Sequence, residues 1–543
     1  MKQIGIVEKY KNIVVVEKGN SFMKIKHYFM QLALFCLLVL FSNNMFSNNV
    51  VVSNLAINGQ NTSNHSSLIN FDISWDNSWR NSVGTTNWDA CWVFVKYRKK
   101  AENTWHHATL STTNSDHTAP TNSIIRTSSD GKGIFIYRSG DMLQGSVSYT
   151  GAKLQWNYGT DGLVDADSVE VCVFAIEMVY VPTGSFYVGD GTTTDIEGQF
   201  ESGTSGAAKQ ITSEGSLTLG GGGTNSLGNN NASGMNTADD FNDGTSKTLP
   251  AAFPKGYNAY YCMKYSVTQE QYVAFLNKLT YTQQDTRTAI APNSAAGTGA
   301  LKSDNAYRNG IDIMTPGVSS NTPAVYACNL DGDANYNETV DGQNIACNYL
   351  SWADLAAYLD WAALRPMSEL EYEKTCRGDH AVVANEYAWG TTNITQATGI
   401  SNSGANNETA SNSGANCAYG NNSNVQGPVR VGCFGQGVNT REGVGASYYG
   451  IMEMTGNLWE RCVTVGNNTG RAYTGIHGDG ALDITGDANV SNWPVSSGTG
   501  SCFRGGDWND VLVWLRVSDR IRGAKSYSTR GYSYGGHGVR MVP

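Results

Sequence analysis

The sequence is short of charge, and it lacks the motifs of several common protein classes. Charged residues make up 15% of the 543 residues, against about a quarter in ordinary globular proteins. The longest basic run is Arg98-Lys99-Lys100 and the net charge is −10, so an electrostatic nucleic-acid binder is excluded. No Cys-x-x-Cys occurs, which leaves zinc ribbons and thioredoxin-like redox sites without support. The Ala, Glu, Lys and Leu bias of coiled coils and helical bundles is missing too.

What the chain does contain favours short strands, turns and irregular loops. It has 61 glycines, and Asn, Ser and Thr are abundant beside them. The 13 Trp, 28 Tyr and 16 Phe residues supply enough apolar surface to build real cores, which argues against disorder. At roughly 150 residues per domain, the length predicts two or three domains.

The N-terminal segment has the features of a secretory signal. Lys24 and Lys26 follow Met23, and a mostly apolar run from Phe29 to Phe41 comes next. This run is shorter than the roughly 20 residues that span a bilayer. We therefore expect residues 1–47 to be a signal segment with Met23 as the true start, and a single membrane anchor is the alternative. An exported protein of the periplasm, cell surface or extracellular space is expected, without an integral membrane span after signal removal.

Export would also allow disulfides to form. Of the 11 cysteines, Cys36 lies inside the apolar run, which leaves ten. Their connectivity does not follow from the sequence, but Cys91 and Cys172 fall in the first predicted domain and could pair there.

Residues 50–175 are predicted to form an antiparallel β-sandwich. Apolar and polar residues alternate in segments such as Ile69–Trp75, and turn signals separate the segments. From residue 176 to residue 543 the sequence pattern changes from alternating strands to helix caps and polar loops. Three helices are expected there, with Thr268, Ser351 and Ser368 as N-caps. The Gly-, Ser-, Thr- and Asn-rich residues 190–247 and 391–430 are expected to be long loops.

This second region resembles the sulfatase-modifying-factor, or formylglycine-generating-enzyme, family. Nine blocks occur in the family's order between about residue 177 and residue 543, including Leu364–Gly378, Tyr448–Glu460 and Phe503–Trp508. Any single block is weak, but nine collinear blocks are specific. The resemblance implies a loop-rich α+β domain related to C-type lectins, and it does not cover the first domain.

Four arginines in the last blocks are expected to be mainly architectural. Because a guanidinium has five donors in a fixed geometry, it suits a fold with few regular ladders. We expect buried groups that bridge loop carbonyls and carboxylates, with an anion pocket as the alternative, at Arg504, Arg516, Arg520 and Arg540.

The resemblance also implies a structural Ca²⁺ ion on the Glu-Met-Thr-Gly-Asn-Leu-Trp-Glu block. Its ligands would be the side chains of Glu453 and Glu460 and the backbone oxygens of Gly456 and Leu458. The alternative is a capped turn with solvated acids. Independently, Asp331, Asp333, Asn335 and Asn337 alternate like the start of a calcium loop, although position twelve of an EF-hand falls on Gly342.

The family's oxidase converts a substrate cysteine to formylglycine with Cu(I) held by two thiolates just after the Arg-Gly-Gly-x-Trp block. Here residues 503–543 contain no cysteine, and Asp510 stands about where the first thiol would be. A carboxylate holds Cu(I) poorly, so copper is not expected.

We therefore expect a calcium-stabilised, non-enzymatic binding or scaffold module whose partner is a glycan or an envelope protein. One alternative is a formylglycine-generating oxidoreductase acting on a sulfatase cysteine, with thiols recruited from Cys433, Cys462 or Cys502. Another is an envelope lipoprotein or a component of a motility-type assembly.

Overall fold

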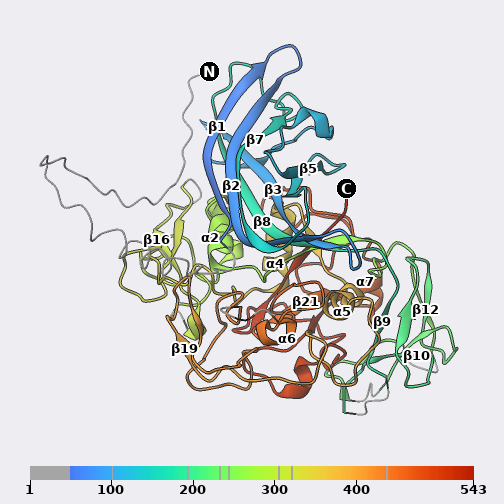
Figure 1. The fold of residues 1–543 in the computed structure, drawn as a ribbon. Helices are drawn as coiled ribbons and strands as arrows, with labels where there is room; N and C mark the ends of the chain where they lie inside the picture. Colours follow the sequence, from blue (N-terminus) through green and yellow to red (C-terminus); the bar gives the residue numbers. More distant parts are fainter. Residues whose placement is uncertain are drawn as a thin grey trace, which may run out of the picture.

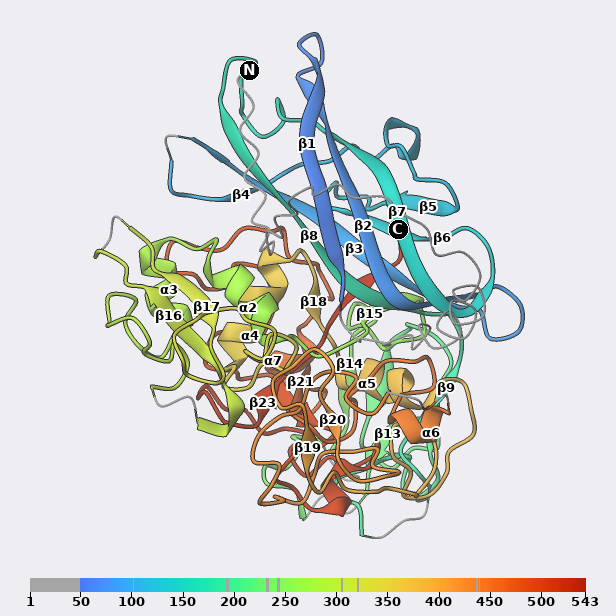
Figure 2. The same ribbon diagram turned by 60° about the vertical axis from the view of Figure 1, so that its left-hand side comes forward.

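In the computed structural model, the described residues are 49–543 without residues 101, 192–194, 231–233, 242–244, 304–305, 320–321, 436–437 and 439. The expected signal segment, residues 1–47, lies outside them. Long strands of the first domain stand on one side of a larger, loop-rich second domain (Figures 1 and 2). No helix in the described part of the chain is both long and apolar enough to cross a membrane.

The first domain consists of two β-layers around one core. One layer has β1 (Val51–Asn61), β2 (Ser66–Asn81) and β7 (Met142–Trp156). The other has β3 (Asn87–Lys99), β4 (His106–His107), β5 (Ser123–Thr127), β6 (Ile134–Arg138) and β8 (Val169–Val181). All of these strands pair antiparallel. Alternate residues of β2 from Ile69 to Trp75 are buried against Val93 and Val95 of β3, because successive side chains of a strand point to opposite faces.

Strand β8 belongs to both domains. Besides β3, it pairs with β15 (Tyr260–Met263), which pairs with β24 (Gly538–Met541), which in turn pairs with β18 (Arg365–Pro366). The boundary expected between residues 175 and 176 falls inside this strand. One sheet thus runs from the first domain to the C-terminal strand, which fixes the two domains to each other.

Side chains of β3 also fasten the first domain to the second. Trp92 Nε1 donates to the Ala362 carbonyl at 2.8 Å. Lys96 Nζ donates to the carbonyls of Trp361 at 2.7 Å and Gly480 at 2.6 Å. Burial lowers the pKa of Lys96 well below its usual range.

The short helices of the second domain are α2 (Gln269–Leu276), α3 (Tyr281–Arg287), α4 (Trp352–Trp361), α5 (Glu369–Arg377), α6 (Arg441–Val444) and α7 (Asn468–Arg471). Three of them, α2, α4 and α5, begin where the sequence predicts, and the others were not predicted. The capping boxes expected at Thr268, Ser351 and Ser368 are all present. A fourth box, Thr280 with Gln283, begins α3, which the sequence analysis did not identify.

The prediction of one long loop over residues 190–247 is wrong in part. A four-stranded sheet is formed there by β10 (Phe200–Ser202), β12 (Leu217–Leu219), β13 (Leu227–Asn229) and β14 (Lys247–Leu249). Another short strand, β11 (Lys209–Ile211), pairs with β9 (Phe186–Val188). Three-residue strands are too short to show the alternation that identifies a strand in a sequence.

The remaining strands are two to five residues long. They are β16 (Ile311–Thr315), β17 (Val325–Cys328), β19 (Ile400–Ser401), β20 (Thr409–Ala410), β21 (Trp459–Val463), β22 (Ser501–Arg504) and β23 (Tyr534–Gly535), with 3₁₀ turns at Asn114–Asp116, Ala306–Arg308 and Leu512–Leu515. Antiparallel sheets with a few helices confirm the α+β class. The C-type-lectin-like topology stays a prediction.

Buried ion pairs hold the loops of the second domain around α5. Arg504 Nη2 donates to Glu373 at 2.7 Å and Arg520 Nε donates to Glu369 at 2.7 Å. Arg520 Nη1 also donates to Asp239 at 2.7 Å. All five side chains are fully buried. The expected architectural role is therefore confirmed for Arg504 and Arg520.

The other two expected arginines differ from each other. Arg540 is buried and donates to Ala363 O and to both oxygens of Asp130. Arg516 is only partly buried and pairs with the exposed Asp195 at 2.9 Å. The expectation therefore holds for Arg540, and Arg516 lies nearer the surface than expected.

No disulfide is present among the described residues. The pairing considered for Cys91 and Cys172 is wrong. In the β3–β8 ladder Cys91 lies opposite Glu177 and Cys172 opposite Lys96. The two cysteines are thus five ladder positions apart, which places their Cα atoms about 17 Å apart at about 3.3 Å per residue. A disulfide requires Cα atoms within about 7 Å of each other.

Glu369→Gln should destabilise the fold by about 3–5 kcal/mol, because it removes the buried carboxylate that Arg504 and Arg520 share and leaves each guanidinium with one carboxylate partner. Glu170→Gln is the matched control. Glu170 pairs with Arg98 at 2.6 Å where both side chains are partly exposed, so its loss should cost about 0–1 kcal/mol. Urea unfolding of both variants measures the difference, and equal losses would contradict the role given to this network.

Candidate functional site

Two of the sequence blocks form one structural unit. The turn at residues 453–458 packs on the Arg-Gly-Gly-Asp-Trp block, residues 504–508. Gly456 N donates to Gly505 O at 2.8 Å, and Trp508 N donates to Asn457 O at 3.0 Å. Gly505 has φ +82°, and a Cβ there would lie 2.6 Å from Met454 O. Only glycine fits so close to this carbonyl, so steric contact requires the glycine at position 505 of the block.

A pair of buried carboxyl groups follows this block. Asp507 N donates to Asp510 Oδ2 at 3.1 Å, and Asp510 N donates to Asp507 O at 3.2 Å. Burial and the neighbouring charge of Asp507 raise the pKa of Asp510 to about 8, and burial raises the pKa of Asp507. Two like charges in one buried site do not both ionise readily. The pair therefore retains a proton at neutral pH and offers hard oxygen atoms, where Cu(I) needs soft sulfur.

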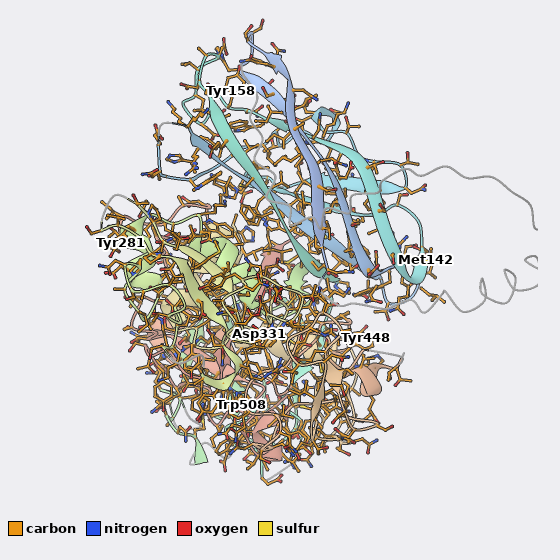
Figure 3. The ribbon with its side chains drawn as sticks, turned by 90° about the vertical axis from the view of Figure 1, so that its left-hand side faces the viewer. Met142, Tyr158, Tyr281, Asp331, Tyr448 and Trp508 are labelled. Carbon is orange, nitrogen blue, oxygen red and sulfur yellow. The ribbon has the colours of Figure 1, made fainter. Side chains whose placement is uncertain are left out.

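An aromatic cluster lies beside the acid pair. The rings of Tyr307 and Tyr532 have centroids 4.9 Å apart, and Trp508 lies 5.4 Å from the first and 5.6 Å from the second. Tyr307 is 40% exposed and Tyr532 38% exposed, whereas Trp508 is 2% exposed. The tryptophan thus forms a base under two tyrosine rings that face solvent. Figure 3 shows Trp508 within the second domain.

A buried amide holds the two tyrosines in place. Asn348 Nδ2 donates to Tyr307 O at 2.9 Å and to Tyr532 O at 3.0 Å. Asn348 Oδ1 in turn accepts from Asn309 Nδ2 at 2.9 Å. Asn348 therefore joins two loops that are far apart in the sequence.

The backbone at this place is also unusual. Tyr307 has φ 53° and Arg308 has φ 62°, in the left-handed region that costs a non-glycine residue about 1–3 kcal/mol. Such strain persists only where the surroundings impose it, and it is concentrated at functional sites. The same conformation occurs at other described residues, such as Glu453 and Asn457, so it supports a role for the tyrosine pair only together with the Asn348 hydrogen bonds.

The thiols that the oxidase alternative would recruit are in the wrong places. Cys462 and Cys502 lie directly opposite each other on β21 and β22, and both are fully buried. Burial raises the pKa of Cys462 well above its usual range, and the adjacent Cys502 adds to the rise. Cys433 is buried in a separate core cluster, and burial raises its pKa to about 12. All three are buried rather than in a surface pocket, although Cys433 shares its core cluster with Trp508, and the raised pKa values of Cys433 and Cys462 disfavour the thiolate that binds a metal.

The expected calcium residues divide into two kinds. Glu453 has φ 57°, accepts from Gly432 N through Oε1 at 2.5 Å, and has an Oε2 atom that is buried without a hydrogen-bond partner among the described residues. Burial raises the pKa of Glu453 to about 7. The Oε2 atom of Glu453, which is buried without a donor, is therefore suited to bind a cation. Gly456 and Leu458 follow in the same turn.

The Glu460 carboxylate already has a partner within the protein, His537. Its Oε2 accepts from His537 N at 3.0 Å and lies 2.9 Å from His537 Nδ1. The sequence analysis missed His537, because nothing near it in the sequence indicates that β24 brings it to the turn. Glu460 therefore fits an internal acceptor at least as well as a metal ligand.

Asp510→Asn should flatten the pH dependence of stability. The folded-state pKa of Asp510 is about 8 and its ordinary value is 3.8, so between these values the folded chain holds a proton that the unfolded chain has lost. The stability contributed by this group is complete below the lower value and is lost as pH rises to the upper one. An asparagine amide keeps the contact with Asp507 without titrating.

Urea unfolding across this pH window measures the effect. Asp285→Asn, at an exposed position of α3, should retain the wild-type slope. An unchanged slope in Asp510→Asn would refute the shared proton.

Comparison with known proteins is consistent with these blocks. A family model described as "Sulfatase-modifying factor enzyme 1-like domain" matches residues 167–542, and this range includes all of β8. No curated protein matches the chain. Because the match covers more than half of the sequence, the chain belongs to the sulfatase-modifying factor family.

Proposed function

We propose that this chain is an exported, non-oxidase member of its family that binds a glycan on the Tyr307–Tyr532 surface. The main support for this proposal is the exposed tyrosine pair, which Asn348 holds in place. The pair lies beside two acids at the place where the family's oxidase has thiols. The second domain would act as a binding or scaffold module of the periplasm, cell surface or extracellular space.

Sugars are the ligands that suit this chemistry. The apolar C–H face of a sugar ring packs on an aromatic ring, while its hydroxyl groups need nearby polar partners. Both rings are available here, and Asn509 Nδ2 lies 3.4 Å from Tyr532 Oη. Val511 and Leu512, 56% and 41% exposed, follow the acid pair in the chain and add apolar surface.

The oxidase alternative finds less support. A formylglycine-generating oxidoreductase acting on a sulfatase cysteine would have to use Cys462 and Cys502, which are paired across a ladder but fully buried. A substrate thiol would have to reach them through the packed core around Val179, Tyr372 and Val517.

Tyr307→Ala and Tyr532→Ala should each weaken glycan binding by about tenfold, because each removes one stacking ring worth about 1.4 kcal/mol. A glycan array with the whole chain identifies the sugar, and calorimetry then measures Kd. Tyr281→Ala on α3, elsewhere on the second domain (Figure 3), is the control and should bind as the wild type does.

Two results would overturn the glycan proposal. One is a wild-type chain that binds no sugar on the array. The other is a Tyr281→Ala variant that loses as much affinity as the two site variants. Capture of an envelope protein that depends on Tyr307 and Tyr532 would point to a protein partner instead.

We also propose that a structural Ca²⁺ ion stabilises the turn, held by the side chains of Glu453 and Glu460 and the backbone oxygens of Gly456 and Leu458. Its support is the partnerless Glu453 Oε2 atom, since a buried carboxylate oxygen without a donor is costly. Because Glu460 already pairs with His537, the ion would depend mainly on the side chain of Glu453.

Removal of Ca²⁺ by a chelator should therefore lower the melting temperature, because an ion at 100 times its Kd stabilises the native state by about 2.7 kcal/mol. Glu453→Gln should remove most of the melting-temperature shift assigned to this ion. Glu102→Gln, at an exposed position of the first domain, should leave the shift intact. An identical shift in Glu453→Gln would rule out this ligand set.

A further inference from the structure

A second group of oxygen ligands lies outside the turn and the tyrosine surface. It is the acidic loop, residues 331–341, which follows β17 and precedes α4. The carboxylate oxygens of Asp331, Asp333 and Glu338 all lie within 4.8 Å of one another, and the three residues are exposed. Figure 3 shows Asp331 on the second domain. Three acidic side chains this close repel one another unless a cation lies between them.

Nothing positive in the described part of the chain compensates this charge. Neither Lys nor Arg among the described residues forms an ion pair with Asp331, Asp333, Glu338 or Asp341. The contacts within the loop come from neutral donors. Asp333 N donates to Asp331 Oδ1 at 3.3 Å, and Asn335 N donates to Asp333 Oδ1 at 2.8 Å. These bonds shape the loop without cancelling its charge.

Asp341 supplies an independent observation that points to a ligand. Its side chain is 0% exposed, and its Oδ2 accepts from Glu338 N at 2.6 Å. Its Oδ1 is buried and has no hydrogen-bond donor within the described residues. The hydrogen bond from Glu338 N holds this carboxylate next to the acidic cluster. A buried carboxylate oxygen without a donor is costly, and a nearby cation offsets that cost.

We propose that the acidic loop binds one Ca²⁺ ion through the carboxylates of Asp331, Asp333 and Glu338, with the buried carboxylate of Asp341 beside them. The three ligands are hard oxygens, which suit Ca²⁺ and do not suit zinc or copper. Several direct carboxylates in an irregular loop favour Ca²⁺ over Mg²⁺, which requires near-octahedral geometry and keeps its waters. Loop carbonyls and water complete the six to eight oxygens that Ca²⁺ takes.

This ion would fasten a loop that several elements depend on. Asn337 Oδ1 accepts from Cys328 N at the end of β17, at 3.0 Å. Gly342 N donates to Gly404 O at 3.0 Å, just after Asp341. Bound Ca²⁺ would thus connect β17, the approach to α4 and the segment around Gly404. The site shares no residue with the turn at Glu453 or with the proposed glycan surface.

Terbium luminescence tests this site, because Tb³⁺ substitutes for Ca²⁺ and is excited through a nearby tyrosine. Tyr336 lies inside the loop, between Asn335 and Asn337. We expect Tb³⁺ added to the whole chain to give tyrosine-sensitised emission that Ca²⁺ displaces and that Tyr336→Phe greatly reduces. Asp331→Asn/Asp333→Asn, at two exposed positions, should weaken Ca²⁺ displacement by at least about tenfold without unfolding the chain.

The control variants separate this site from the others. Asp285→Asn should leave emission and Ca²⁺ affinity unchanged, and Glu453→Gln should leave the Tyr336-dependent emission unchanged. Emission and affinity in Asp331→Asn/Asp333→Asn equal to those of the wild type would overturn the proposal. So would emission that survives in Tyr336→Phe but disappears in Glu453→Gln, because the ion would then lie at the turn.

Discussion

The second domain depends on the buried pairing of arginines with the carboxylates of α5. Its loops are glycine-rich and form few regular ladders, so many backbone carbonyls must find partners elsewhere. Arg504 meets this need by donating to the Asp519 and Val517 carbonyls while its other donors contact Glu373. Arg520 does the same with Gly198 O and Glu369. A buried ion pair is stabilising only when its remaining donors are satisfied, and here they are.

This network fixes the place where the chemistry of the site would occur. Arg504 begins the block whose Gly505 touches the 453–458 turn and whose Trp508 lies under the tyrosine pair. Buried ion pairs therefore hold the frame at the place where the resemblance implies the copper site of the family's oxidase. In this chain the residues that follow are Asp507 and Asp510. We propose that this change of ligand type exchanges soft-metal binding for hydrogen bonding.

How much the sequence predicted depends on how local each feature is. The capping boxes at Thr268, Ser351 and Ser368 are confirmed, since a cap and its third helical residue lie within one turn. The family was identifiable from the order of its blocks. The three-residue strands between residues 200 and 249 were missed, because such segments form only against neighbours that the fold supplies.

The parts of the site contributed by distant segments could not be predicted. Tyr307 and Tyr532 meet because Asn348 bonds to both of their carbonyls. His537 reaches Glu460 because the final strand returns to the main sheet. Likewise, the DxDxN pattern of residues 331–335 was visible, but the partnerless Oδ1 of Asp341 is a property of packing. Spacing alone therefore identified candidate ligands without showing which oxygens lack a donor.

The central claim is that this family member retains the frame of the oxidase without its copper chemistry. The most direct measurement is Cu(I) titration of the reduced whole chain against a competing chelator, together with mass spectrometry of a Cys-x-Pro-x-Arg peptide incubated with it under oxygen. The account predicts no Cu(I) retained against the chelator and an unchanged peptide thiol. One equivalent of tightly held Cu(I), with oxygen-dependent conversion of the cysteine to an aldehyde, would contradict it.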